Sequence, residues 1–461
     1  MNGTLPLPPD SFRVVLLGKQ ATEVLVATGE NCLSLPSIEI PKNTRVAEEC
    51  NSATAKRWGI TSYSLCTRNI RAAADEAKPI RYIVMEACHT GTKVPPAMAW
   101  IPLRSVLPAS FSNPDDFTLL TEWIADTPKP GSTRGFFAQP QSLRTILPWV
   151  EMQTAPLGLC PTGEFRQLNC GPQFSLIRFA TGNSAVWFKA VGEPNLRELP
   201  ITLALTKLFP SYLPRLLGAR EDWNAWLTLE AAGSHLSETS GFDAWTTAAA
   251  ALSQLQIASL GQALHLIDAG CRDMRACRLR QRLTPFLEAA AELMDLQTKP
   301  APEPVSREQL RTLGAQFEDA LAVLENIDIP NALGHLDLSP GNLLVRGNSC
   351  VFLDWAEAFV GHPFLTIAYL IEYLRRNPAR QSREGEILDA YTSAWRLYFE
   401  EKSVNAALSV APMLAAFAYA VSIDVSQYPI QPDTAKLLRS LTRRMKRDAD
   451  IFTSGKSLCI S

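Results

Sequence analysis

The most informative part of the chain reads ALGHLDLSPGNLLV at residues 332–345 and VFLDW at residues 351–355. A loop that carries the carboxylate of Asp337 and the amide of Asn342, five residues apart, runs into a short apolar strand. A turn separates it from a second strand, which ends at Asp354. Because the two ends of a hairpin lie close together, we expect Asn342 and Asp354 to face one point.

These side chains are suited to phosphate chemistry. Carboxylate and amide oxygens are hard ligands that Mg²⁺ accepts, with water and phosphate completing its shell. Asp337 lies one loop turn away, where it can orient a hydroxyl group and accept its proton during phosphoryl transfer. An ordinary β-hairpin with an Asp turn is the alternative interpretation of the same residues.

The segment resembles the His-x-Asp-x-x-x-x-Asn catalytic loop, and the metal-binding Asp that follows it, of the aminoglycoside phosphotransferase and choline kinase superfamily. The resemblance implies that Asp337 is the catalytic base, that Asn342 and Asp354 hold Mg²⁺, and that His335 supports the loop. The family usually has Gly after the His, where this chain has Leu336; the difference concerns backbone freedom and removes no reacting group.

A lysine and a glutamate upstream supply a second part of such a site. Lys189 ends an apolar strand predicted at 185–189, directly after a hairpin turn at 181–183 that contains Gly and Asn. Glu198 follows nine residues later, in the first turns of a predicted helix. A buried lysine needs a partner, and in kinase-like folds such a Lys–Glu pair positions the ATP phosphates. Taken singly, the two residues would be interpreted as surface charges.

Three more assignments come from the same resemblance. Residues 169–173 are the expected loop over the phosphates, and backbone groups of Glu230 and Ala232 are expected to bind adenine at a hinge between two lobes. A strand that simply leaves into a loop explains the hinge segment equally well. His362 stands where many relatives have Asp, and we interpret it as a structural loop residue.

The resemblance covers about residues 160–440 and implies an α+β fold of the bilobal protein-kinase type. We expect a small antiparallel nucleotide-binding lobe at 161–232 and a helical catalytic and substrate lobe at 233–461, preceded by a linker and helix at 129–160. A separate mixed α/β domain is expected at 1–128, because residues 126–141 contain three prolines and two glycines with little periodicity.

Periodicity and breaker residues predict the individual elements. In the first domain we expect strands at 12–17, 23–27, 81–86 and 97–102, helices at 46–58 and 115–124, and a loop at 36–41. In the small lobe we expect strands at 174–179, 185–189, 213–217 and 225–231, and a helix at 193–208. The other helices are expected at 142–152, 243–259, 279–296, 306–324, 366–375 and 387–401, with two more up to about 450 and a β-rich interruption at 332–355.

The first domain bears a weaker resemblance, over residues 12–125, to a Nudix fold. An active Nudix box needs acidic residues on the helix that ends at Gly59 to hold a divalent metal. The places of its Arg and three Glu residues are held here by Ser52, Ala53, Lys56 and Arg57, although Glu48 and Glu49 remain. If the resemblance holds, hydrolase activity is absent, and we expect a structural or ligand-presenting role. An unrelated α/β domain is the alternative.

Composition and net charge limit the classes of binding partner that we expect. Hydrophobic residues make up 46% and charged residues 20% of the chain, and the formal net charge is −2, so we expect neither nucleic-acid nor membrane binding. No run approaches the roughly 18–20 apolar residues that span a bilayer. The first residues lack signal-peptide features, and the ten cysteines are scattered without a Cys-x-x-Cys motif, so we expect a cytoplasmic protein.

The sequence therefore supports an ATP- and Mg²⁺-dependent phosphotransferase with a small hydroxylated molecule as acceptor. It identifies neither that acceptor nor the oligomeric state. The alternative is a nucleotide-binding pseudoenzyme that acts as a scaffold or sensor. A protein kinase is disfavoured, because Trp355 and Ala356 replace the Phe-Gly that follows the metal-binding Asp in such enzymes, and no long activation segment precedes the helices.

Overall fold

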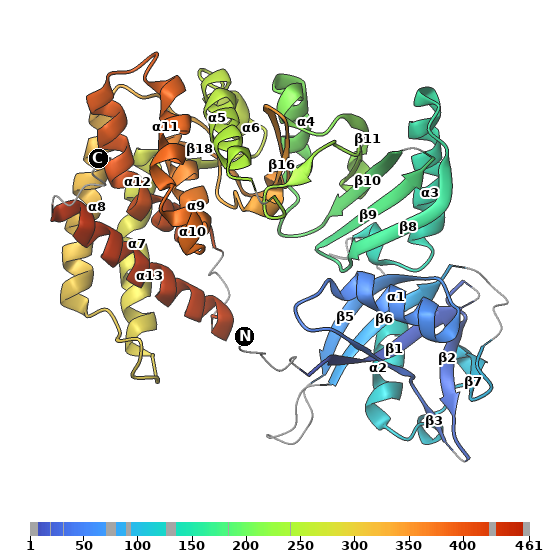
Figure 1. Ribbon diagram of the computed structural model, residues 1–461. Helices are drawn as coiled ribbons and strands as arrows, with labels where there is room; N and C mark the ends of the chain where they lie inside the picture. The colour runs from blue at the N-terminus through green and yellow to red at the C-terminus, as the bar shows by residue number, and fades with distance from the viewer. Residues whose placement is uncertain are drawn as a thin grey trace. The chain divides into compact units, whose positions relative to one another are not determined.

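The computed structural model divides the chain into two compact units (Figure 1). Unit 1 comprises Met1–Leu199 and Arg215–Glu230, and unit 2 comprises Pro200–Pro214 and Ala231–Ser461. The residues that the structure describes are 8–18, 20–30, 32–70, 80–88, 94–125, 135–182, 184–239, 241–423 and 430–454.

Unit 1 contains a seven-stranded mixed sheet. Strand β1 (Asp10–Gly18) lies in its middle and pairs in parallel with β6 (Ile80–Ala87), while the other pairs are antiparallel. The sheet order is β3-β2-β1-β6-β5, with β4 also on β1 and β7 also on β2. The remaining strands are β2 (Glu23–Thr28), β3 (Leu33–Ser34), β4 (Ser37–Ile40), β5 (Ser62–Ile70) and β7 (Met98–Pro102).

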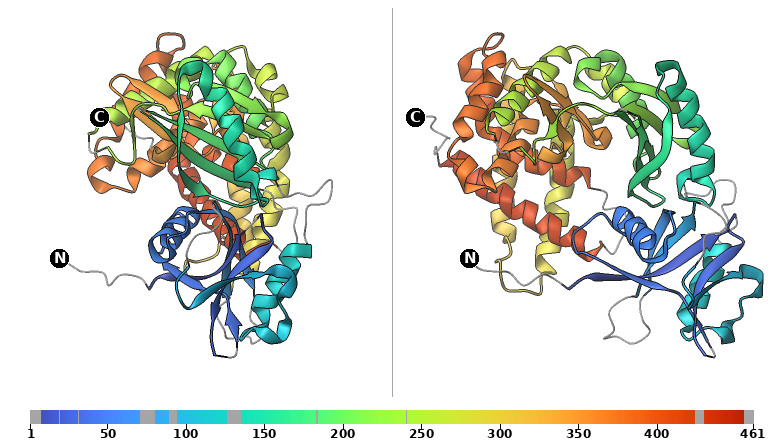
Figure 2. Two further views of the ribbon diagram at one scale, coloured as in Figure 1. Left: turned by 90° about the vertical axis from the view of Figure 1, so that its right-hand side faces the viewer. Right: turned by 45° about the vertical axis from the view of Figure 1, so that its right-hand side comes forward.

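Successive residues of β1 serve two cores, because strand side chains alternate between faces. Helix α1 (Val46–Trp58) covers one face of this sheet (Figure 2). Val14 and Leu16 pack on that face, and Val15 and Leu17 pack on the opposite face. Burial on both faces explains the unbroken apolar run in β1, as is usual for strands in parallel pairing.

The helix predicted at 46–58 is confirmed with the same bounds, and Gly59 ends it with φ 69°. The positive φ explains why glycine stands there. Helix α2 (Pro114–Ala125) confirms the second helix. The loop predicted at 36–41 is wrong, since it contains β4, whose exposed and buried residues alternate; β5 was not predicted.

The second sheet of unit 1 has five antiparallel strands in the order β11-β12-β10-β9-β8. Its strands are β8 (Pro161–Asn169), β9 (Phe174–Thr181), β10 (Ser184–Val191), β11 (Leu216–Arg220) and β12 (Ala225–Leu229). Thr181 and Ser184 close the β9–β10 hairpin as predicted, although Asn183 of the predicted turn lies outside the described residues. Helix α4 (Glu198–Leu208) begins five residues later than predicted, because turns occupy the start of that segment.

The two sheets of unit 1 share one hydrophobic core. Val15 and Tyr82 of the first sheet belong to the same buried cluster as Ile177 and Phe188 of the second. The side chain of Gln167 exchanges two hydrogen bonds of 2.7 Å with the backbone of Ser64. The domain boundary near residue 128 stays a prediction.

The segment predicted as a linker at 126–141 is described only from Gly135 onward. There Phe137 and Ala138 are buried in the same cluster of unit 1, and the Tyr63 hydroxyl donates to the Phe137 carbonyl (2.9 Å). This end of the predicted linker is therefore part of the core. Helix α3 (Ser142–Thr154) follows, two residues longer than predicted.

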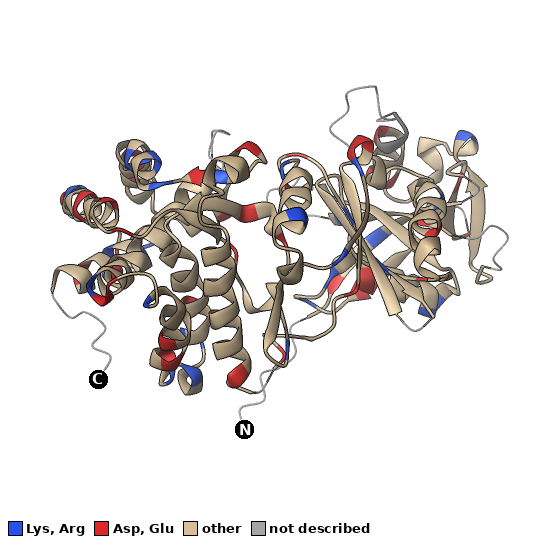
Figure 3. Ribbon diagram, turned by 90° about the horizontal axis from the view of Figure 1, so that it is seen from above, with Lys and Arg blue, Asp and Glu red and all other residues tan. Residues whose placement is uncertain are grey.

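Unit 2 is mainly helical. Helices α7 and α8 run side by side (Figures 1 and 2), and α8 begins with a capping box in which Ser306 and Gln309 each bond the other's backbone. Basic and acidic positions are interspersed along its helices (Figure 3), and some form ion pairs, such as Arg280 with Glu325 (2.7 Å). The helices are α5 (Asp243–Ala258), α6 (Ala263–Asp268), α7 (Ala276–Asp295), α8 (Arg307–Asn326), α9 (Phe364–Arg375), α10 (Pro378–Gln381), α11 (Glu384–Trp395), α12 (Glu401–Ser422) and α13 (Pro432–Thr453).

Two three-stranded sheets interrupt these helices. One has the order β13-β16-β17 and the other β14-β18-β15. Their strands are β13 (Ser234–His235), β14 (Arg272–Met274), β15 (Ala332–His335), β16 (Leu343–Arg346), β17 (Ser349–Phe352) and β18 (Ala358–Gly361). The β-rich interruption predicted at 332–355 is confirmed, whereas β13, β14, β18, α6 and α10 were not predicted.

The statement that no run is apolar enough to span a bilayer is wrong for one segment. Among the helices of the described residues, α12 alone is long and apolar enough, with a mean hydropathy of 1.7 over its most apolar window. Residues of that helix such as Val404, Leu414 and Phe417 are buried in the main hydrophobic cluster of unit 2. This burial identifies α12 as a core helix of unit 2.

Candidate active site

The structure brings Asp337, Asn342 and Asp354 of unit 2 together. The side-chain amide of Asn342 donates to the Asp337 carbonyl oxygen (2.9 Å), so its Oδ1 atom is the part of the amide that a cation can use. The backbone N–H of Leu353 donates to the Asn342 carbonyl oxygen (2.9 Å), which places Asp354 next to Asn342. Local hairpin pairing thus produces the arrangement that the sequence predicted, while the chemical roles of the three residues stay predictions.

His335 fastens this loop from inside the protein. Its Nδ1 accepts a hydrogen bond from the Asp337 N–H (3.1 Å), and its Nε2 lies 3.1 Å from the Leu353 carbonyl oxygen. A carbonyl oxygen only accepts, so Nε2 carries the proton and the imidazole is neutral. Both ring nitrogens are therefore engaged in holding the loop and the strand that leads to Asp354. This geometry agrees with a positioning residue and leaves no nitrogen for proton transfer to a substrate.

The backbone of Asp354 is in an unusual conformation. Its φ of 61° and ψ of 68° lie in the left-handed region, which non-glycine residues enter at a cost of about 1–3 kcal/mol. Asp354 is exposed and follows the last residue of β17 by two positions. Such strain concentrates at functional sites, and the charge of Asp354 acts on Asp337 of the loop.

Asp337 is suited to accept a proton near neutral pH. Burial raises its pKa to about 6, and the negative charges of Asp354 and Glu357 contribute to the rise. The excess negative charge is also a reason to expect a cation in this place. Among the described residues, no group of three or more His, Cys, Asp and Glu side chains could hold a metal ion. Asn342 and Asp354 instead fit Mg²⁺, which keeps several waters and takes phosphate oxygens.

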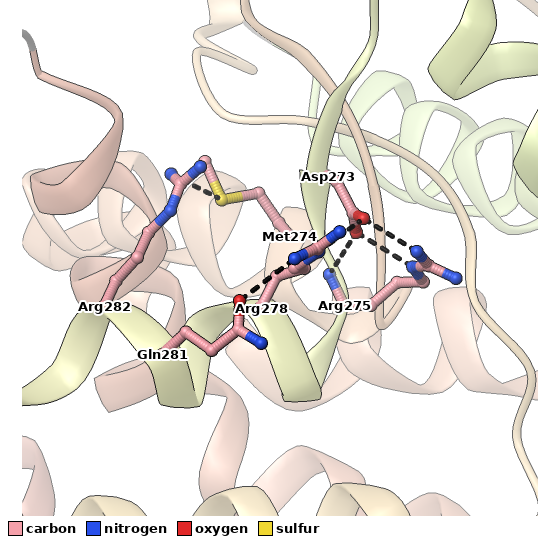
Figure 4. A network of polar contacts seen from close by, with 6 residues as sticks. All are labelled: Asp273, Met274, Arg275, Arg278, Gln281 and Arg282. Atoms are coloured by element: carbon pink, nitrogen blue, oxygen red, sulfur yellow. Dashed lines mark hydrogen bonds and ion pairs between the residues drawn. The ribbon is translucent and has the colours of Figure 1, made fainter.

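Two residues near this site were missed in the sequence. The Glu357 carbonyl accepts a hydrogen bond from the Leu336 N–H (3.0 Å), and the Glu357 carboxylate pairs with Arg272 through Nε (3.0 Å) and Nη2 (3.2 Å). Arg272 begins β14. The carboxylate of the next residue, Asp273, accepts hydrogen bonds from Arg275 and Arg278 (Figure 4). A glutamate three residues after Asp354 was the available signal, but its partner lies 85 positions away.

Three tyrosines form a second missed group. Tyr369 and Tyr373 share one face of α9, and the ring of Tyr369 lies 5.9 Å from Tyr373 and 5.5 Å from Tyr419 of α12 between centroids. On the same face of α9, Thr366 accepts the backbone N–H of His335 (3.1 Å). Burial is the main cause that raises the pKa of each tyrosine, and the charge of Asp337 adds to it. The tyrosines therefore lie within electrostatic reach of Asp337.

In unit 1 the predicted pair of Lys189 and Glu198 is present. The Lys189 ammonium lies 2.5 Å from a Glu198 carboxylate oxygen, and the side chains are only 15% and 3% exposed. The lysine also lies 5.7 Å from the ring centroid of Trp226. Desolvated charges of this kind persist when they are paired, and the pair connects β10 to the first turn of α4.

The hinge assignment needs one correction. The N–H of Glu230 donates to the Ala185 carbonyl (3.0 Å), so this N–H is not available to adenine and only the carbonyl remains. The Glu230 carboxylate is bound by Arg178 (2.6 and 2.9 Å), which holds its pKa low. The boundary between the two units falls directly after Glu230, and Ala232 follows in unit 2.

Two more residues or segments were assigned from the sequence, His362 and the loop at 169–173. His362 is buried, and burial lowers its pKa to about 3, in agreement with a structural residue. In the expected phosphate loop, Gly171 has φ 141° and Gln173 accepts the Gly192 N–H (2.7 Å), while the role of this loop stays a prediction.

Comparison with known proteins places a family match over most of unit 2. The model of the phosphotransferase enzyme family matches residues 196–401, which supports a phosphotransferase activity. No curated protein matches the chain.

Similar solved structures include kinases of small molecules. A choline kinase from Cryptosporidium parvum Iowa II is 14% identical, with 68% of this chain and 97% of that chain covered and a TM-score of 0.48. A choline/ethanolamine kinase family protein from Mesorhizobium loti is also 14% identical, with 66% and 99% covered and a TM-score of 0.43. A macrolide 2'-phosphotransferase from Brachybacterium faecium is 16% identical, with 64% and 97% covered and a TM-score of 0.42.

Proposed function

We propose that this chain is an ATP- and Mg²⁺-dependent phosphotransferase that moves the γ-phosphate to a hydroxyl group of a small molecule. The observation that carries the proposal is the cluster of Asp337, Asn342 and Asp354, held by His335, in a segment that matches the phosphotransferase family model. Phosphoryl transfer to an alcohol requires a general base next to a bound cation. Asp337, whose pKa is raised to about 6, would supply the base, and Asn342 and Asp354 would supply oxygen ligands for the cation.

Each residue has one part in the proposed mechanism. Lys189, oriented by Glu198, would bind the α- and β-phosphates. Asn342 and Asp354 would hold Mg²⁺, whose contribution when bound is to neutralise charge on the phosphates. Asp337 would accept the proton of the acceptor hydroxyl as the hydroxyl oxygen forms the new bond to the γ-phosphorus and the bond between that phosphorus and the oxygen of the leaving ADP breaks. Tyr369, Tyr373 and Tyr419 would form a wall of the acceptor site.

For two variants next to Asp337, the pH profile of kcat/KM is expected to shift in opposite directions. Asp337 must be ionised, so kcat/KM is expected to fall as the pH drops through about 6. Glu357→Gln removes a like charge and lowers the pKa of Asp337. The acidic limb of the kcat/KM profile, where activity falls as Asp337 is protonated, then moves to lower pH by about half a unit. Arg272→Gln leaves the charge of Glu357 unneutralised and moves the limb to higher pH. The measurement is kcat/KM against pH.

Arg278→Gln is the control for this pair, because Arg278 contacts Asp273 and not Glu357. Its profile should coincide with that of the parent. Shifts of Glu357→Gln and Arg272→Gln in the same direction would contradict the electrostatic explanation.

The proposed activity is tested by ADP release from ATP–Mg²⁺ in the presence of a library of hydroxylated metabolites, with Asp337→Asn protein as the blank. Acceptor-dependent ADP release by the parent alone supports the proposal. Stabilisation by ATP–Mg²⁺ without turnover of ATP under any condition would instead favour the pseudoenzyme. Absence of both would overturn nucleotide binding altogether.

For residues 1–128 we propose a structural role within unit 1. Glu48 is one of the two acidic residues left on the helix that was compared with the Nudix box. It forms an ion pair with Arg166 of β8. Asn51 of the same helix bonds Gln167 (3.0 Å). Helix α1 thus contributes its polar groups to contacts with the second sheet, which supports a bracing function for that sheet.

A further inference from the structure

A cavity of about 470 Å³ lies in unit 2, lined by residues from the end of α9, the short α10, the start of α11 and the end of α13. Its volume is in the range that takes a small organic ligand. Six of its eight lining residues are charged. None of the eight belongs to the candidate active site, so the cavity calls for an explanation of its own.

Part of the lining is already neutralised by ion pairs. Arg375 makes two hydrogen bonds with Glu384, at 2.7 and 2.6 Å, in the bidentate geometry that satisfies both groups. Glu372, which also lines the cavity, lies 3.5 Å from Arg444, which is not a lining residue. These pairs explain the fold of this part of the lining and leave little charge for a ligand.

The lining as a whole has a positive excess. Counting the lining residues and Arg444, four guanidinium groups stand against three carboxylates, which leaves one net positive charge. The excess belongs to Arg376, which forms no ion pair with any carboxylate of the described residues and whose guanidinium lies 4.1 Å from the ring centroid of Tyr373. Arg447, 56% exposed, pairs with one oxygen of Asp448 (2.9 Å) and retains further N–H groups. Arg376 and Arg447 together suit an anionic group.

Asp448, the lining residue that follows Arg447 in the chain, has a buried acceptor atom. Asp448 is 7% exposed and lines the cavity, and its Oδ2 accepts no hydrogen bond from any described residue. The nearest cation is Arg444, whose Nε is 3.5 Å away and also lacks a hydrogen bond. A buried carboxylate oxygen without a donor is costly, by about 1–3 kcal/mol. A ligand with an O–H or N–H group would supply the missing donor.

We propose that this cavity binds a small organic anion that also carries a hydroxyl or amino group, with the anionic group on Arg376 and Arg447 and the donor on Asp448. The proposal goes beyond the phosphotransferase function, because binding here requires neither ATP nor turnover.

The test is thermal unfolding of the full chain, with glycerol 3-phosphate and malate as probes. Sulfate serves as an anion without a donor, and glycerol as a donor without charge. ADP–Mg²⁺ is present at a saturating concentration throughout, so that no probe reports on a nucleotide site. We expect a saturable rise in Tm with glycerol 3-phosphate or malate, and a clearly weaker response to sulfate and to glycerol.

The variant Arg376→Gln/Arg447→Gln is expected to lower the apparent affinity for the probe at least about tenfold. Both side chains are exposed, so its Tm without probe should stay near that of the parent. Arg383→Gln is the matched control, because Arg383 is an exposed arginine that pairs with Glu386 outside the cavity. No saturable response to either organic anion, an equal response to sulfate, or an unchanged response in the double variant would each overturn the proposal. All of these readouts are independent of catalysis.

Discussion

Asp337→Asn is expected to lower kcat about 10³-fold while the affinity for ATP–Mg²⁺ changes less than about twofold. Asn has the shape of Asp but cannot accept the hydroxyl proton, and a general base contributes about 10²–10⁴ in rate. The residues proposed to hold nucleotide and metal are unchanged. The measurements are single-turnover phosphorylation and calorimetric titration with a nonhydrolysable ATP analogue.

The same variant carries an internal check on stability. The pKa of Asp337 is raised from 3.8 to about 6 in the folded chain. A raised pKa means that the group favours folding when protonated and loses this contribution as the pH rises towards 6 and beyond. Asp337→Asn cannot ionise, so its Tm should exceed that of the parent at pH 7.5 and approach it at pH 4.

Asp389→Asn, a change of an exposed carboxylate in α11, should keep the parental kcat and Tm. If Asp337→Asn phosphorylates its acceptor at the parental rate, Asp337 is not the base. A loss of nucleotide affinity comparable to the loss of rate would show that Asp337 supports the phosphate site and not proton transfer.

Asp116→Ala is expected to destabilise unit 1 by about 3–5 kcal/mol. Asp116 is fully buried and its carboxylate lies 2.6 and 2.5 Å from Arg13 Nη1. It also accepts hydrogen bonds from the Tyr82 hydroxyl (3.0 Å) and the Leu35 N–H (3.3 Å). Alanine would leave a positive charge, a hydroxyl and a backbone N–H without their common acceptor. Asp116→Asn keeps one acceptor oxygen and should cost less, about 1–2 kcal/mol.

Hydrogen exchange of the amides of β1 and β6 is the appropriate measurement, since a chain with two compact units need not unfold in one transition. Glu122→Gln, at an exposed position of the same helix, is the control and should change protection by less than about 0.5 kcal/mol. Unchanged protection of β1 and β6 in Asp116→Ala would mean that the surrounding core, and not the carboxylate, holds this part of the sheet.

The sequence alone was sufficient to predict local geometry where the interacting residues are close to one another in the chain. Asp337, Asn342 and Asp354 meet because one loop and one hairpin connect them, and helix 46–58 ends where Gly59 takes a positive φ. In both cases a few backbone hydrogen bonds set the geometry, so residue types and their spacing contain the necessary information.

Only the tertiary structure decided the rest. The parallel pairing of β1 with β6, the contact of Arg272 with Glu357 and the wall of α13 along the cavity join segments tens of residues apart. The apolar composition of α12 shows the same point, because its burial among other helices, and not its hydropathy, identifies it as a core helix. Local patterns record which face of an element is apolar, but the element against which that face packs depends on the free energy of the whole folded chain.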